Sequence, residues 1–123
     1  MKLFEINNDI FKKGIERFPL LDSILLSMQV YSSEVEGVCI ELMFDVSHRG
    51  HNQKMKLVFK KVLQYNFYYD SSFAFYNVES FKFFPIEEKG QFYLSLAPDD
   101  EVAAISEDDE DFILAENAIL YYQ

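Results

Sequence analysis

The clearest pattern in the chain is an alternation of apolar and polar residues that runs through segments 38–46 and 55–67. A period of two is typical of antiparallel strands that bury one face. The polar stretch Ser47–Gln53 joins the two segments, so together they predict a β-hairpin. The predicted inward face, in which Lys61 is the one misfit, carries Val38, Ile40, Leu42, Phe44, Val46, Met55, Leu57, Phe59, Leu63, Tyr65 and Phe67.

Cross-strand charge pairs predict the register of this hairpin. The register that places Asp45 opposite Lys56 also places Glu41 opposite Lys60, so two pairs of opposite charges face each other. A shift by two residues would leave the acids facing valine and would lose terms of roughly 0.2–1 kcal/mol each. We therefore expect the first register, with a local bulge near Lys60–Lys61.

Residues 8–18 predict a short helix. Their apolar side chains fall near one side, an asparagine can cap the start, and Pro19 ends the helix. The outward face of the hairpin is only half polar, so we expect the helix to cover it. The apolar band to be covered consists of Cys39, Met43, Val58 and Val62.

Four further segments predict strands. In segment 24–32 we expect Ile24, Leu26, Met28 and Val30 to point inward, which adds a third strand to form a meander. Segments 78–86, 92–97 and 112–122 predict more strands, with Pro85 at an end or an edge position. The chain therefore predicts a single domain over residues 1–123 of the mainly β (α+β) class. We expect an antiparallel meander that forms a curved sheet or sandwich of about six to seven strands, with a short N-terminal helix.

The charge of the chain is unevenly distributed. Bases and acids balance through residue 82, whereas eleven acids and one base follow, which accounts for the net charge of −10. Binding to a nucleic acid backbone needs a basic surface, so we expect no nucleic acid partner. An acidic lobe instead favours a basic protein partner.

The location of the protein is predicted from what the sequence lacks. No apolar run approaches the ~18 residues that a membrane helix needs. The first residues carry an early acid and no apolar signal-peptide core. We expect a cytoplasmic protein that does not contact a membrane, and the oligomeric state stays open.

The candidate binding residues are the acids that precede the last predicted strand. Their consecutive spacing, without a glycine, differs from the alternating oxygen ligands and sharp turn of a calcium loop. A solvated loop is the alternative explanation, because charge runs usually serve solvation. Within the loop, Ser106–Asp109 has the composition of a capped helical turn. The candidate set is Asp99, Asp100, Glu101, Glu107, Asp108, Asp109, Glu110 and Asp111.

Signals for catalysis are few. His48 and His51 lie in the predicted hairpin turn and, with Asp45, would supply two imidazoles and a carboxylate to zinc in a metal-dependent enzyme. A solvated polar turn explains the same residues and is the interpretation that we favour. Cys39 has no histidine at a recognisable spacing, and the four glycines stand singly, unlike a phosphate-binding loop. We expect a protein that is not an enzyme and that carries no metal or cofactor.

The aromatic stretch Tyr65–Tyr76 leaves two interpretations open. Aromatic residues in strands are often core, whereas exposed tyrosines favour protein partners. The aromatic-rich interior also supports an alternative function, a small-molecule-binding β domain.

Two stretches carry a resemblance to known families. Phe18–Ile24 leads into the meander, and Phe92–Asp99 precedes the acidic run. In this outline the chain resembles small, acidic, mostly β bacterial families that include immunity proteins of polymorphic toxins and domains of unknown function. The resemblance implies a cytosolic protein that binds another protein, such as a toxin domain, and neutralises it. Together with the charge distribution, it predicts a non-catalytic protein-binding module, an immunity-type inhibitor being one form, that uses the acidic C-terminal lobe on a basic partner.

Overall fold

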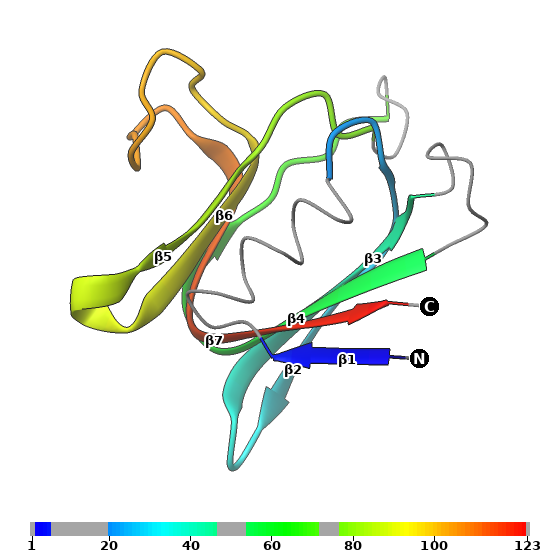
Figure 1. Cartoon of the computed structure of the whole chain (residues 1–123), viewed down its shortest axis with the longest axis vertical. Helices are drawn as coiled ribbons and strands as arrows, with labels where there is room; N and C mark the ends of the chain where they lie inside the picture. The colour runs from blue at the N-terminus through cyan, green and yellow to red at the C-terminus, as the bar shows by residue number, and fades with distance from the viewer. Residues whose placement is uncertain (1, 6–19, 47–53, 72–76, 123) are drawn as a thin grey trace.

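The computed structural model describes residues 2–5, 20–46, 54–71 and 77–122. Within them the chain forms one open antiparallel sheet of seven strands, in the order β2-β3-β4-β7-β6-β5, with β1 paired to β7 (Figure 1). The prediction of a mainly β, antiparallel fold is confirmed, and the predicted helix over residues 8–18 lies outside the described residues. The strands are β1 (Lys2–Glu5), β2 (Ile24–Ser33), β3 (Gly37–Asp45), β4 (Lys54–Asn66), β5 (Lys82–Ile86), β6 (Gln91–Ala97) and β7 (Glu110–Tyr122), and the 3-10 helix η2 (Glu87–Lys89) lies between β5 and β6.

The last strand, β7, lies at the centre of the sheet. Along one edge it pairs with β4 from Phe112 to Tyr122. Its other edge is shared, because β6 pairs with Glu110–Ala115 and β1 pairs with Ile119–Tyr122. The predicted meander of β2, β3 and β4 is confirmed as consecutive antiparallel pairs.

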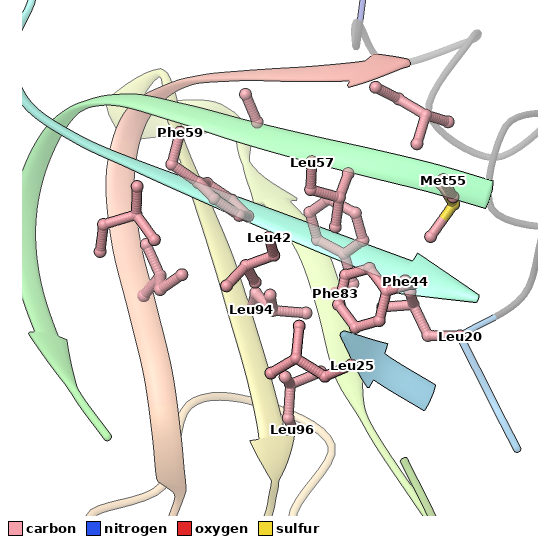
Figure 2. Close-up of a cluster of buried hydrophobic side chains, with 14 of the residues drawn as sticks. Leu20, Leu25, Leu42, Phe44, Met55, Leu57, Phe59, Phe83, Leu94 and Leu96 are labelled. Atoms are coloured by element: carbon pink, nitrogen blue, oxygen red, sulfur yellow. The ribbon is translucent and has the colours of Figure 1, made fainter. Parts of the chain in front are cut away.

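The sheet curls strongly around a core on its concave side (Figure 1). β7 and β6 lie between β4 and β5 in the sheet order, so a flat sheet would separate β4 from β5 by roughly 14 Å. The rings of Phe59 on β4 and Phe83 on β5 nevertheless have centroids only 6.1 Å apart. The side chains labelled in Figure 2 come from β2, β3, β4, β5 and β6 and from Leu20 before β2, and β7 adds Ile113, Ala115, Ala118 and Leu120 to the same core.

The two ends of the curled sheet are also linked by the backbone. Asn77 forms an isolated antiparallel bridge with Ile24, the first residue of β2. The amide of Val78 donates to the carbonyl of Ser23, and the amide of Asp22 donates to the carbonyl of Val78. The chain entering β5 therefore holds the start of β2.

The predicted register of the β3–β4 hairpin is wrong by two residues. The structure pairs Glu41 with Val58, and Asp45 with Lys54. Lys56 instead reaches Glu41 diagonally, with 2.6 Å between its Nζ and Oε1 of the carboxylate. The shifted register therefore keeps an ion pair of Glu41 with lysine, which removes the reason for preferring the predicted one.

The predicted irregularity at Lys60–Lys61 is present, but its effect on the following residues was not expected. Lys61 has a φ of 52°, in the left-handed region, and its amide donates to the carbonyl of Glu36. After this residue the alternation of faces is reversed. Val62 packs against the core instead of belonging to the outward band, whereas Leu63, predicted to point inward, is 47% exposed. A second irregularity between Val62 and Gln64 returns Tyr65 to the face of its buried partner Ile113, where it is still 47% exposed, and Phe67 packs against the core as predicted.

The predicted inward face of β2 is also partly wrong. Leu25 is the buried residue, and Ile24 and Leu26 are exposed. An irregularity in the pairing between Leu25 and Ser27 returns Met28 to the face of its β3 partner in the core. Val30 follows on that same face, and both side chains remain more than a third exposed because β2 lies at the edge of the sheet.

Candidate functional site

The acidic residues of the candidate set divide into two groups in the structure. The side chains of Asp109 and Asp111 are buried, and Asp99 is half-buried. The exposed members are Asp100, Glu101, Glu107, Asp108 and Glu110. The acidic run is therefore both an internal anchor and a charged surface.

Asp109 is the anchor of the loop between β6 and β7. Its Oδ1 accepts hydrogen bonds from Lys82 Nζ at 2.7 Å and from the Asp99 amide at 2.9 Å. Its Oδ2 accepts from the Tyr93 hydroxyl at 2.6 Å and from the Ser106 amide at 3.0 Å. Each carboxylate oxygen thus accepts two hydrogen bonds, as a buried charge requires.

The sheet supplies the donors from its outward face. Phe83 and Leu94 pair on the core side of β5 and β6, so the neighbouring Lys82 and Tyr93 point outward. Both are nevertheless buried, at 9% and 2% exposure, because the loop folds back over them. Lys82 Nζ also donates to the carbonyl of Ala104, a second point of attachment for the loop.

The aromatic surroundings of Tyr93 complete this attachment. Its ring lies 5.4 Å from the ring of Phe84 and 6.0 Å from that of Phe112. Two residues after Tyr93, on the same face of β6, the hydroxyl of the fully buried Ser95 donates to the carbonyl of Glu110 at 2.6 Å. The outward face of β5, β6 and β7 is therefore a second packed layer under the loop.

Electrostatics in this cluster strongly favour the charged form of Asp109. Burial alone would raise its pKa, but the hydrogen bonds from Lys82, Tyr93 and the two amides outweigh burial and lower the pKa to about 2. Burial and the bond to Asp109 raise the pKa of the Tyr93 hydroxyl. The carboxylate is therefore ionised, and the phenol neutral, at any physiological pH.

Short-range bonds fix the rest of the loop. The hydroxyl of Ser106 accepts from the Asp108 amide and donates to Asp99, while Asp109 reaches back to the Ser106 amide. This is the hydrogen bonding expected of a capped helical turn. It closes a single turn, from the Ser106 carbonyl to the Asp109 amide, instead of starting a helix.

A second buried acid connects the acidic run to the aromatic stretch. Asp111 has a φ of 48°, and its Oδ1 accepts from the Tyr68 amide at 2.9 Å. Three tyrosines of this segment are exposed: Tyr65 by 47%, Tyr68 by 61% and Tyr69 by 58%. The structure thus places exposed tyrosines beside the end of the acidic run. Of the aromatic stretch Tyr65–Tyr76, Phe67 instead packs against the core, and residues 72–76 lie outside the described residues.

A separate polar row crosses the outward face of four strands. The Tyr31 hydroxyl of β2 donates to Glu41 of β3 at 2.7 Å, and Glu41 pairs with Lys56 of β4, whose Nζ lies 5.8 Å from the ring centre of Tyr121 on β7. The bond from Lys56 lowers the pKa of Glu41, and the bond to Glu41 raises the pKa of Tyr31 to about 12. These side chains are partly exposed and satisfy one another, so the row stabilises the sheet modestly.

The remaining predicted sites have these placements. His48 and His51 lie outside the described residues, and Asp45, their expected companion, lies in β3. Among the residues that the structure describes, no group of three or more His, Cys, Asp and Glu side chains is placed to hold a metal ion. Cys39 is buried, with its Sγ near the Glu36 and Gly37 carbonyl oxygens at 3.8 and 3.7 Å.

Sequence reasoning missed the role of Lys82 and Tyr93. A usable signal was present, because Lys82 is the one base between Lys61 and Lys89 and alternates outward in a strand. Burial of a lysine requires a paired acid, and the acidic run offered many.

Comparison of the chain with protein-family models, with curated proteins and with solved structures found no match. In the described part of the chain, none of the helices is both long and apolar enough to cross a membrane.

Proposed function

We propose that this chain is a non-catalytic protein-binding module that docks the exposed acids of the loop between β6 and β7 on a basic surface of its partner. An immunity-type inhibitor, which neutralises a toxin domain by covering it, is one form of this function. The observation that supports the proposal best is the anchoring of Asp109 by four hydrogen bonds. A solvating charge run needs no such anchor.

Anchoring matters because a flexible loop loses conformational entropy when it binds. A loop already held in one conformation avoids most of that loss. The attachment to Lys82 and Tyr93 therefore presents the exposed charges in a fixed arrangement. Fixed charges of one sign also accelerate association with an oppositely charged partner.

The neighbouring tyrosines add contacts of another kind. Tyr65, Tyr68 and Tyr69 are exposed beside the run that ends at Asp111. Tyrosine is enriched in protein interfaces, and its ring face attracts lysine and arginine. A basic partner would therefore find both carboxylates and ring faces in one area.

The test compares two variants of equal net charge. The loop variant combines Asp100→Asn, Glu101→Gln, Glu107→Gln and Asp108→Asn, whereas the control combines Glu34→Gln, Glu79→Gln, Glu87→Gln and Glu88→Gln, which are exposed acids elsewhere. Each removes four negative charges and raises the net charge from −10 to −6. All the anchoring bonds of Asp109 remain, so both variants should fold like the wild type.

The immobilised wild-type protein captures its partner from an extract of the source cells, and the partner is identified by mass spectrometry and purified. We expect a basic protein whose Kd rises about fourfold or more with the loop variant, since four exposed pairs at roughly 0.2–1 kcal/mol each contribute about 0.8 kcal/mol or more together. The dependence of Kd on salt should also become shallower, and the control variant should bind like the wild type. If both variants weakened binding equally, or if neither weakened it, the acidic loop would not be part of the interface.

A further inference from the structure

Among the residues that the structure describes, the edge of the sheet at β2 is open for most of its length. Asn77 occupies the edge at Ile24. Beyond that residue β2 pairs with β3 on one side, and no other strand of the described residues lies on its free side. From Ser27 to Ser33 the pairing with β3 is regular, which leaves a straight free edge.

The other edges of the sheet carry the features that usually prevent pairing with another chain. β5 has only five residues and contains Pro85. β1 has four residues. β2, in contrast, has ten residues without a charge or a proline. Natural sheets rarely leave an edge of this length and composition uncovered.

The side chains at the open edge are apolar where the core continues toward it. Met28 and Val30 pair with Leu42 and Ile40, both fully buried. They therefore extend the concave apolar face to the edge, and they are 36% and 39% exposed there. A strand added beside β2 would cover them.

We propose that β2 pairs with β2 of a second copy of this chain, antiparallel and related by a twofold axis at Gln29. This register places Met28 opposite Val30 of the other copy, and Val30 opposite Met28. A twofold axis produces each such contact twice, as in most protein dimers. A register shifted by one residue would set side chains of the core face against those of the outward face, so it is unfavourable.

The charge distribution also favours a second copy as the occupant. An uncharged strand offers a basic partner no charge complementarity, whereas two copies of this negatively charged protein can meet there without repulsion between the strands themselves. The acidic loop lies beside β5 and β6, at the other end of the sheet order from β2 (Figure 1). Charges separated by more than a Debye length of about 8 Å are largely screened at physiological salt.

Sedimentation equilibrium of the full chain tests the association. We expect the weight-average mass to rise with concentration from 14.5 kDa to twice that value. High salt should leave the dimer intact or strengthen it, whereas it should weaken capture of a basic partner by the acidic loop. Val30→Lys should raise the dimer dissociation constant at least about tenfold, because a lysine at an edge opposes strand pairing.

Leu63→Lys is the matched control, since it also replaces an exposed apolar strand residue by lysine, and it should dimerise like the wild type. Circular dichroism establishes that both variants keep the fold. A wild-type protein that stays at 14.5 kDa up to millimolar concentration would overturn the proposal, and so would equal effects of the two lysines.

Disulfide formation tests the register independently of any destabilisation by lysine. Directly opposed residues of antiparallel strands have Cα atoms about 4.5–5.5 Å apart, which suits a disulfide. Gln29→Cys should therefore give a covalent dimer under mild oxidation. Ser33→Cys should not, because four residues on each side of the axis separate the two copies of this position by roughly 27 Å. The wild type, whose Cys39 is buried, should stay uncrosslinked, and a failure of Gln29→Cys, or equal crosslinking at both positions, would refute this pairing.

Discussion

Replacing Asp109 by asparagine should destabilise the fold far more than the loss of one acidic charge on an acidic protein would suggest. Each carboxylate oxygen accepts from one amide and from one side chain, Lys82 or Tyr93. Asparagine offers one acceptor oxygen and one NH2 group, which is itself a donor. Whichever oxygen is replaced, two buried donors lose their acceptor.

The size of the effect follows from the burial of the pair. The side chain of Asp109 is fully buried and that of Lys82 is 8% exposed. Removing one partner of a buried ion pair leaves the other charge unpaired and costs about 3–5 kcal/mol. That is a large part of the roughly 5–15 kcal/mol by which a domain is stable.

The pKa of Asp109 gives a second, smaller free energy, which depends on pH. Because folding lowers the pKa of Asp109 from an ordinary 3.8 to about 2, its ionised form stabilises the folded state by about 2–3 kcal/mol. This stabilisation is complete above the ordinary pKa and is lost as the pH falls from about 4 to about 2. The asparagine variant lacks it, so the difference in unfolding free energy between wild type and variant should shrink across that range.

Urea unfolding followed by circular dichroism, at pH values from 7 down to 2, measures both quantities. Asp108→Asn is the control, because it removes the same charge from an exposed neighbour and should change stability by no more than about 0.5 kcal/mol. Two results would refute the reasoning. One is an Asp109→Asn variant as stable at pH 7 as Asp108→Asn, and the other is a difference from wild type that stays constant from pH 5 to pH 2.

Two further substitutions test single features of the fold. Ser23→Ala should leave stability unchanged or raise it by about 1 kcal/mol in thermal unfolding, because the fully buried hydroxyl of Ser23 has no hydrogen-bond partner among the described residues; a clear loss would mean that this hydroxyl is satisfied. Gly37→Ala should cost about 1–2 kcal/mol, since Gly37 has a φ of 66° and an added Cβ would meet only the Cα of Lys61, at an ordinary 3.6 Å. Gly37→Asn should cost less than Gly37→Ala, because asparagine tolerates left-handed backbone better, and the reverse order would contradict a purely conformational cause.

The strands were predictable because period-two alternation is a local signal. The segments of β3 and β6 were found in this way. β7 was predicted as a last strand without that pattern, and it begins only two residues before its predicted start. The predicted inward and outward faces of the strands were wrong where the backbone departs from regular strand geometry. The left-handed Lys61 reverses the alternation in β4, and the irregularity after Leu25 reverses it in β2. The position of the first irregularity was predictable, but its consequence for Val62 and Leu63 was not.

The hairpin register failed for a different reason. Charge matching assumed that opposite charges must stand directly across the ladder. Glu41 and Lys56 meet diagonally at 2.6 Å, so the register shifted by two residues also forms an ion pair. Long flexible side chains therefore leave several registers close in energy, and packing of the core decides among them.

The candidate site was predictable as a charged segment but not as an arrangement. That the acids gather after residue 82 is a property of the sequence alone. Which of the acids is buried depends on how the loop folds over the outward face of β5 and β6. There Lys82 and Tyr93 donate hydrogen bonds to Asp109. These residues come from three separate segments, and no local pattern records that they meet.

By itself, the sequence determined the β class, most of the strands and the uneven charge, because each of these depends on residue type and short-range spacing. Only the tertiary structure decided that Asp109 anchors the acidic loop, that the exposed tyrosines lie beside Asp111, and that β2 ends the sheet with an open apolar edge. All three arise from the curl of the sheet and the order of its strands. Distant segments become neighbours there, and the free energy of a contact depends on what the rest of the chain has already placed around it.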